Sequence, residues 1–226
     1  GLLFMASTVG AVRSAVRVTL GGAVDVAALA AMINRVYKVG EKGIITDSDE
    51  RPFRRMTPED VQTLLDGGSL LLVRPHDELD DPAAVLGCIK VDLRISQQGV
   101  IAGERVGEWG CLAVAEAAQG RGLARILVAA AEKQLLDAGC TIAELELLAP
   151  SKWKQAHKER LRSWYQRLGY VLKVPGDYEA STTRLPQGTL LLDRFELASE
   201  SDFTIYRRRI MVAEHAASGT GSSLDW

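Results

Sequence analysis

The chain has 226 residues, a net charge of −2 and 25% charged side chains. This length suffices for one substantial α/β domain with its own core and is too short for two comfortable ones. The balanced charge gives no reason to expect binding to nucleic acid or to a membrane surface, and no apolar run approaches the length of a membrane span.

The first half of the chain predicts a strand, two helices and a strand hairpin. We expect residues 1–15 to be flexible and residues 16–20 to form a short strand. Asp25 is a typical N-cap for a helix that extends to residue 38, and the sequence Thr57-Pro58 followed by two acids predicts the start of a second helix. The mostly polar residues 43–55 between them predict a loop. Residues 70–74 and 84–95 are typical of two strands that pair as a hairpin.

The middle of the chain predicts a strand, a glycine-rich turn and a helix in that order. The strand contains Glu108 and continues through residues 109–114, and residues 123–136 form an amphipathic run. Free N–H groups in the first turn of a helix, the positive end of its dipole and glycines that admit a ligand together predict a phosphate site. The turn lacks the Gly-Lys-Ser/Thr of a Walker loop and the third glycine of a dinucleotide fingerprint. It consists of Gln119, Gly120, Arg121, Gly122, Leu123 and Ala124.

The rest of the chain predicts a strand, a helix and two further strands. Residues 142–147 alternate as a half-buried strand does, and apolar side chains recur at helical spacing from Trp153 to Leu168. Strands are expected at residues 170–174 and 202–210. They are separated by a long connection at residues 175–201, and a connection of this length is usually functional or structured. Residues 214–226 are rich in Ala, Ser and Gly and predict a disordered tail.

The three cysteines and three histidines indicate the cellular compartment and whether to expect a metal site. Cys88, Cys111 and Cys140 are widely spaced and lie in mostly apolar surroundings, which favours reduced, buried thiols in a cytoplasmic compartment. The histidines have no spacing relation to them, so no metal site is predicted. Residues 5–20 carry two arginines and no acid, which leaves an organelle transit sequence as an alternative.

Two motifs resemble the GNAT acetyltransferase superfamily. The turn matches Q-x-x-G-x-A, which is similar to the family's Q/R-x-x-G-x-G/A signature, and residues 164–170 (Trp-Tyr-Gln-Arg-Leu-Gly-Tyr) resemble its second motif. The resemblance covers residues 84–174 well. It implies an α/β (α+β) fold: one domain at residues 16–213 with a mixed, mostly antiparallel central sheet flanked by helices, whose central strands splay to bind acetyl-CoA. Lys158 departs from the family, because many members have Asn there.

The resemblance also implies which residues bind acetyl-CoA. The turn would bind the pyrophosphate, and the backbone of the preceding strand would pair with the pantetheine arm and stabilise the thioester oxygen. The implied set is Leu112, Ala113, Val114, Gln119, Gly120, Arg121, Gly122, Leu123, Ala124 and Arg125.

Two side chains are candidates for the proton transfers. Glu108 lies eleven residues before Gln119, and carboxylates at the start of this strand act as general base in several family members. Since alkyl amines have a pKa near 10.4, a base helps them to react. Tyr165 is the candidate acid for the departing thiolate. The alternatives are that Glu108 is a solvated strand end and that Tyr165 only packs on the sheet.

We therefore expect an acetyl-CoA-dependent N-acetyltransferase that acts by direct attack in a ternary complex, without a metal, on the primary amine of a small molecule. A protein or peptide N-acetyltransferase, a non-catalytic acyl-CoA-binding module and another nucleotide-binding α/β protein stay as alternatives, and a homodimer is compatible with the sequence. In this family the acceptor is usually recognised by the first two helices, their connection and the last loops. Here these supply residues 175–201 together with Tyr37, Glu41, Asp47, Arg51, Arg54 and Arg55, and an arginine fork at 54–55 would suit a carboxylate.

Overall fold

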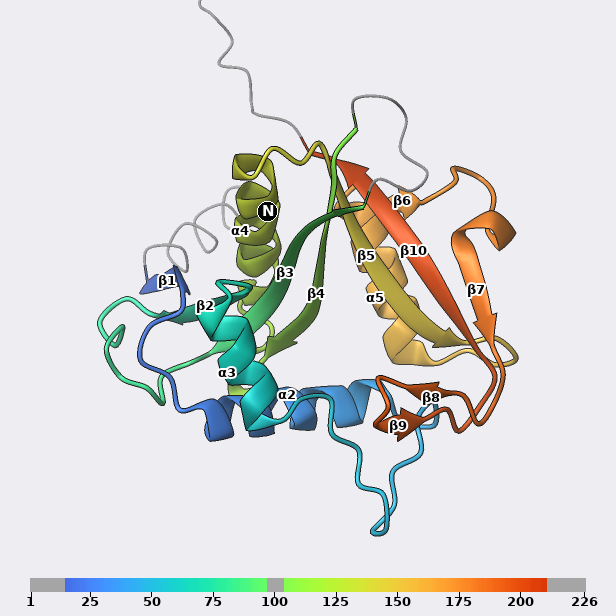
Figure 1. Ribbon diagram of the computed structural model, residues 1–226, viewed down its shortest axis with the longest axis horizontal. Helices are drawn as coiled ribbons and strands as arrows, with labels where there is room; N and C mark the ends of the chain where they lie inside the picture. The colour runs from blue at the N-terminus through green and yellow to red at the C-terminus, as the bar shows by residue number, and fades with distance from the viewer. Residues whose placement is uncertain (1–14, 97–103, 211–226) are drawn as a thin grey trace, which may run out of the picture.

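The computed structural model describes residues 15–96 and 104–210, and a mixed sheet forms the centre of this part of the chain. The strand order is β1-β2-β3-β4-β5-β10-β6, with β7 also paired to β10 (Figure 1). A separate two-stranded sheet joins β8 and β9. The strands are β1 (Val16–Leu20), β2 (Leu70–Pro75), β3 (Gly87–Ser96), β4 (Val106–Val114), β5 (Ile142–Pro150), β6 (Val171–Leu172), β7 (Thr182–Leu185), β8 (Leu190–Leu191), β9 (Phe195–Glu196) and β10 (Ser201–Arg209).

The pairing confirms the predicted mixed, mostly antiparallel sheet. Strands β1 to β4 pair antiparallel in succession, β5 is parallel to β4, and β10 is antiparallel to its three neighbours. The predicted hairpin is the pair β2–β3, although β3 begins at Gly87 rather than at residue 84.

Helices cover both faces of the sheet. On one face lie α2 (Val26–Gly40) and α3 (Pro58–Asp66), and on the other lie α4 (Leu123–Asp137) and α5 (Ala156–Arg167) (Figure 1). The predicted caps are confirmed: the side chain of Asp25 accepts a hydrogen bond from the N–H of Ala28, and Thr57 and Asp60 form a capping box. A short 3-10 turn, η1 (Glu116–Ala118), precedes α4.

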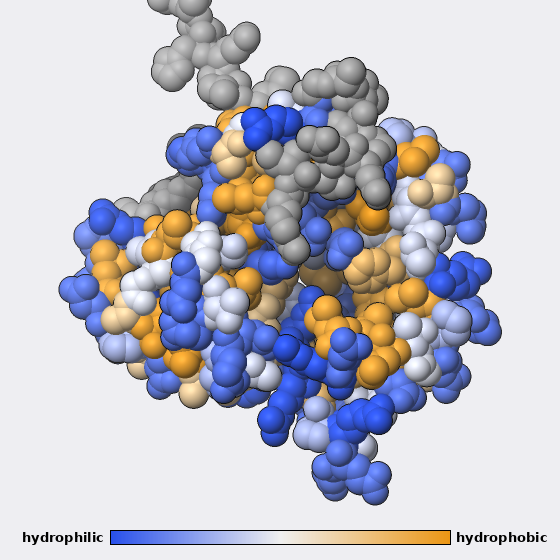
Figure 2. Space-filling view, in the orientation of Figure 1, coloured by the Kyte–Doolittle hydropathy of each residue, from blue (hydrophilic) through white to orange (hydrophobic). Residues whose placement is uncertain are grey.

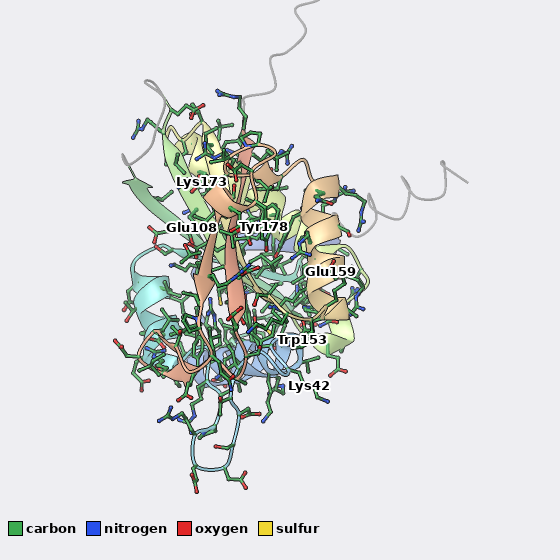
Figure 3. The ribbon with its side chains drawn as sticks, turned by 90° about the vertical axis from the view of Figure 1, so that its right-hand side faces the viewer. Lys42, Glu108, Trp153, Glu159, Lys173 and Tyr178 are labelled. Atoms are coloured by element: carbon green, nitrogen blue, oxygen red, sulfur yellow. The ribbon has the colours of Figure 1, made fainter. Side chains whose placement is uncertain are left out.

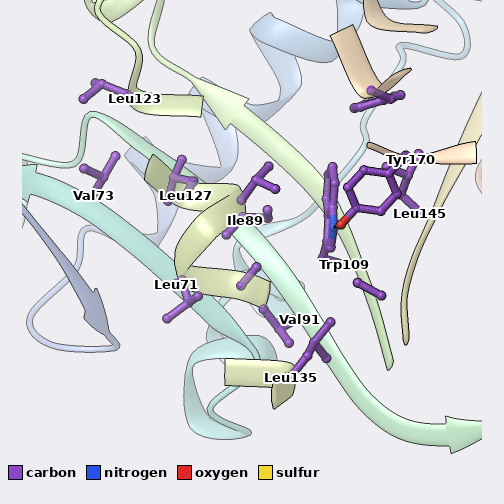
Figure 4. Close-up of a cluster of buried hydrophobic side chains, with 14 of the residues drawn as sticks. Leu71, Val73, Ile89, Val91, Trp109, Leu123, Leu127, Leu135, Leu145 and Tyr170 are labelled. Atoms are coloured by element: carbon purple, nitrogen blue, oxygen red, sulfur yellow. Dashed lines mark hydrogen bonds between the residues drawn. The ribbon is translucent and has the colours of Figure 1, made fainter. Parts of the chain in front are cut away.

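The largest core lies between α4 and the sheet (Figure 4). Leucines of α4 pack there against alternate residues of β2 and β3, and full burial of each such side chain is worth about 1.5–3 kcal/mol. The indole N–H of Trp109 on β4 donates to the Tyr170 hydroxyl at 2.6 Å, and that hydroxyl donates to Glu132 at 2.9 Å. These bonds satisfy the polar atoms of the buried rings and fix the position of β4.

The predicted helix before the second motif is shorter than expected. It begins at Ala156, three residues after Trp153, so the prediction that Trp153 belongs to it is wrong. Trp153 instead lies against Gly43, where a Cβ would be 3.3 Å from the indole. The side-chain amide of Gln155 donates to the carbonyls of Gly40 and Lys42, so this segment joins the end of α2, as the positions of Trp153 and Lys42 in Figure 3 also show.

The long connection at residues 175–201 has structure of its own, in η2 (Glu179–Ser181), β7, β8 and β9. Within the described part of the chain no helix has the length and apolar character needed to cross a bilayer. The expectations for residues 1–14 and 211–226 lie outside the described residues, and the limits of the domain stay a prediction.

Candidate active site

The two central strands separate after three paired positions. Parallel pairing of β4 with β5 runs from Val106 to Glu108 and ends opposite Glu144. Between Gly110 and Ala113, β4 has one residue more than β3 has between the paired Cys88 and Lys90, which makes a β-bulge. Cys111 in this bulge has φ +47°. The face in Figure 2 is hollowed over the gap between β4 and β5. The bulge and the early end of pairing therefore open a cleft within the sheet.

The glycine-rich turn lies at the end of β4, where α4 begins. Gly120 has φ +76° and Gly122, the N-cap of α4, has φ +81°. A Cβ at either position would meet nothing within 4 Å, so the turn faces open space. The Gln119 side-chain amide donates to the carbonyl of Val114 at 3.1 Å and closes the turn, while Arg121 and Arg125 are exposed beside it. This geometry suits an anion.

A first cavity of about 310 Å³ extends from this turn to the second motif. Of the residues predicted to bind acetyl-CoA, Leu112, Val114, Gln119 and Ala124 line it. Ala113 and Leu123 are buried instead, in cores on opposite faces of the sheet. The remaining lining residues include Gly110, Trp164 and Tyr165.

A second cavity of about 240 Å³ adjoins the first and shares Glu146 and Tyr165 with it, among other lining residues. Glu108 lines only the second cavity and Tyr165 lines both, so both predicted catalytic residues border the second cavity. Arg55 also lines it. Its apolar lining includes Ile45, Phe53, Leu148, Leu191, Phe195 and Phe203.

Glu146 on β5 is a candidate functional residue that the sequence pattern did not single out. Solvent reaches its side chain through the cavities, but the surrounding protein removes part of its hydration. This desolvation, followed by repulsion from Glu108, raises its pKa to about 7. A carboxyl group with this pKa is well suited to act as a base at neutral pH.

A buried ion pair lies beside the two cavities. The ammonium of Lys158 on α5 donates to Oε1 of Glu41, next to the end of α2, at 2.7 Å. The side chains are only 5% and 10% exposed, and both line both cavities. Lys158 is therefore buried, although it belongs to a helix that carries several basic residues. It takes the place of the family's Asn and joins the two helices that border the cleft.

Tyr165 is nearly buried against Trp109, with ring centroids 5.8 Å apart. Burial first, and then the nearby Glu41 and Tyr206, raise the pKa of its phenol above the ordinary value. The phenol therefore stays protonated and is available as a donor. Cys111 borders both cavities, but burial raises the pKa of its thiol and nearby Arg55 offsets this only partly, which agrees with a packing role.

The acceptor-recognition residues implied by the resemblance divide into two groups. Tyr37, Glu41 and Arg55 line the second cavity. Leu191, Leu192 and Phe195 of the connection at residues 175–201 line it too. Three residues lie outside it: Asp47 pairs with Lys38, Arg51 pairs with Glu196, and Arg54 is exposed.

Comparisons with known proteins agree with this geometry. The chain belongs to the acetyltransferase (GNAT) family, whose model matches residues 42–170, more than half of the chain. The search of curated proteins finds no match.

Solved structures share the fold at low sequence identity. A GCN5-related N-acetyltransferase from Kribbella flavida is 16% identical, with a TM-score of 0.53 over 88% of this chain and 99% of that one. The protein yncA of Salmonella typhimurium, solved with its cofactor acetyl-CoA, is 16% identical, with a TM-score of 0.50 over 91% and 99%. A chain of the NatC complex bound to Gag peptide and CoA is 14% identical, with a TM-score of 0.52 over 87% and 99%.

Proposed function

We propose that the protein is an N-acetyltransferase that transfers the acetyl group of acetyl-CoA directly to the primary amine of a small acceptor. The observation that carries this proposal is the meeting of two cavities at Glu146 and Tyr165. One cavity extends from an anion-binding turn, and the other contains carboxylates suited to an amine. A volume of 240 Å³ lies below the roughly 300–1,000 Å³ typical of drug-sized ligands, which favours a small acceptor.

The residues of the first cavity fit acetyl-CoA. A Cβ at Gly110, Gly120 or Gly122 would meet nothing within 4 Å, so the backbone is open where a phosphate or a pantetheine arm would approach. The N–H groups at the start of α4, with Arg121 and Arg125, would hold the pyrophosphate. Backbone N–H groups near Leu112 would stabilise the thioester oxygen. The coenzyme supplies the activated acetyl group.

The side chains at the meeting point can move the protons. Glu146 accepts a proton from the amine as its nitrogen bonds to the acetyl carbon and the carbon–sulfur bond breaks. Tyr165 donates to the departing sulfur, and both groups then exchange with solvent to regain their starting states. Glu108, which raises the pKa of Glu146, is the alternative base and keeps that role as a prediction.

The test is the pH dependence of thiol release by the wild type, Glu146→Gln and Glu108→Gln. Glu146 must be ionised to accept a proton, so kcat/KM should fall about tenfold per pH unit below 7 in the wild type. Glu146→Gln should lose about 10²–10⁴-fold in kcat. Glu108→Gln should keep the rate at pH 8 but shift the fall to lower pH, because the repulsion that raises the Glu146 pKa is gone.

Two other outcomes would count against these assignments. If Glu108→Gln shows the large loss and Glu146→Gln only a shift, the base is Glu108. If purified, folded protein does not bind acetyl-CoA in calorimetry, or acetylates peptides in preference to small amines, the proposed function is wrong.

A further inference from the structure

The second cavity carries a charge arrangement that the reaction itself does not require. An amine acceptor needs only carboxylates near its nitrogen, and Glu108 and Glu146 supply these. Arg55 adds a guanidinium in the same cavity. This cation would repel an amine that carried no negative group, so its presence calls for an explanation.

Arg55 packs against two aromatic rings. Its guanidinium lies 5.1 Å from the centre of the Tyr37 ring and 5.9 Å from that of Phe195. Among the ion pairs between described residues, none includes Arg55. Apart from its interaction with the Cys111 thiol, this guanidinium has N–H groups that can bind a carboxylate, the ligand group that best matches its planar fork.

Arg55, Glu108 and Glu146 line the same cavity, and the charge of Arg55 lowers the pKa of Glu146 while that of Glu108 raises it. Besides the paired Lys158 and Glu41, the cavity presents the guanidinium of Arg55 and the carboxylates of Glu108 and Glu146. A molecule whose ammonium and carboxylate are close together is complementary to this pattern. A peptide N-terminus is not, because the α-carboxyl group of its first residue is part of a peptide bond.

The remaining lining is apolar. Phe53 and Phe195 are in edge-to-face contact at 5.3 Å, and Leu191 of the β8–β9 hairpin lies beside them. Figure 2 shows apolar side chains gathered over this hairpin. A polar substrate side chain would lose hydration against this wall without finding a partner.

We infer that the acceptor is a free α-amino acid with an apolar side chain, its carboxylate on Arg55, its amino group between Glu108 and Glu146, and its side chain against Phe53 and Phe195. This inference rests on the proposed function. Of the two arginines that the sequence suggested for a carboxylate, Arg55 binds it, while the exposed Arg54 takes no part.

The experiment compares L-leucine with L-leucinamide and 3-methylbutylamine, which lack the carboxylate, as acceptors in thiol-release assays. Wild type should prefer leucine in kcat/KM by roughly 30-fold or more, the effect expected from a buried charge pair. In Arg55→Gln the ratio should fall to near one. Arg55→Lys keeps the charge but not the fork and should fall in between, and Arg54→Gln should match the wild type. Calorimetry of the coenzyme A complex with leucine gives a second readout, in which binding should weaken most in Arg55→Gln, less in Arg55→Lys and not in Arg54→Gln.

Failure of the inference and failure of the proposed function give different results. If acetyl-CoA binds and the three amines react equally well in the wild type, or if Arg55→Gln slows all three alike, the acceptor is not a free amino acid but the transferase assignment holds. If acetyl-CoA does not bind to the folded protein, both are wrong.

Discussion

The first and second cavities are built in different ways. The first takes a large part of its lining from the stretch Trp109 to Ala124 and the rest from the end of α2, β5 and α5, and its key groups are backbone N–H groups and glycines. The second brings together the connection after α2, β4, β5 and the β8–β9 hairpin, which are far apart in the sequence. A ligand common to a whole family can be bound by backbone geometry, whereas a particular acceptor has to be recognised by side chains.

Long-range ion pairs hold the parts of the second cavity together. Arg194 of the hairpin pairs with Asp60 at the start of α3, and Arg51 donates to Glu196 at 2.8 Å. The Lys158–Glu41 pair lies between the cavities. The comparison therefore predicts that breaking these pairs affects acceptor use, and that changes in the turn affect the coenzyme.

The largest effect is expected from Lys158→Met. The change leaves the Glu41 carboxylate buried and without its cation, and its Oε2 already has no hydrogen-bond partner among the described residues. We expect the free energy of unfolding, measured with urea, to fall by about 3–5 kcal/mol. The double variant Glu41→Gln/Lys158→Met removes both charges and should recover most of this loss.

The matched control is Lys133→Met on α4, whose pair with Asp137 is exposed. In this variant the free energy of unfolding should fall by at most about 1 kcal/mol. If Lys158→Met lowers the free energy of unfolding no more than this control does, the buried pair does not stabilise the packing of α5 against the end of α2.

A smaller effect, confined to the first cavity, is expected from Gly122→Val. Valine disfavours φ +81°, so the turn should shift and lose its alignment with the phosphates. We expect the Kd for acetyl-CoA to rise about 100-fold or more and the stability to fall by about 1–3 kcal/mol. Gly176→Val introduces the same strain at φ +77° in a turn outside both cavities and should leave the Kd unchanged. Equal effects on the Kd would show that strain, not the turn, is responsible.

The contrast also explains how much could be predicted from the sequence. Helix caps, alternation of apolar and polar residues, and glycines in turns are local signals. They predicted the helices, the order of the strands and the turn at Gly120 and Gly122. The family resemblance added the splayed strands. These features depend on residues close together in the chain.

The acceptor side depends on contacts that no local pattern encodes. Glu144 and Glu146 look alike in an alternating strand, but Glu144 pairs with Arg207 while Glu146 faces the cavities. Lys158 belongs to a run of basic residues and is nevertheless buried, because Glu41, more than a hundred residues earlier, lies opposite. The only available signal was that Lys158 departs from the family's Asn.

The smallest expected effect separates the two cavities most cleanly. Arg194 lies next to Leu192 and Asp193, whose φ angles of +51° and +54° are unfavourable outside a turn that is held in place. Arg194 donates to Asp60 at 2.8 Å, and this bond lowers the pKa of Asp60 to about 2, so the pair persists throughout the neutral range. Arg194→Gln should loosen the hairpin and raise the acceptor KM about threefold to fivefold, the equivalent of less than about 1 kcal/mol, as expected for a partly exposed pair.

The same variant should leave the Kd for acetyl-CoA unchanged, because the hairpin does not line the first cavity. Lys133→Gln, which breaks an exposed pair far from the hairpin in sequence, should change neither constant. If Arg194→Gln weakens acetyl-CoA as much as the acceptor, the two cavities are coupled through the hairpin. The separation between a backbone-built and a side-chain-built half would then be wrong, since a change at one surface ion pair would be felt at both.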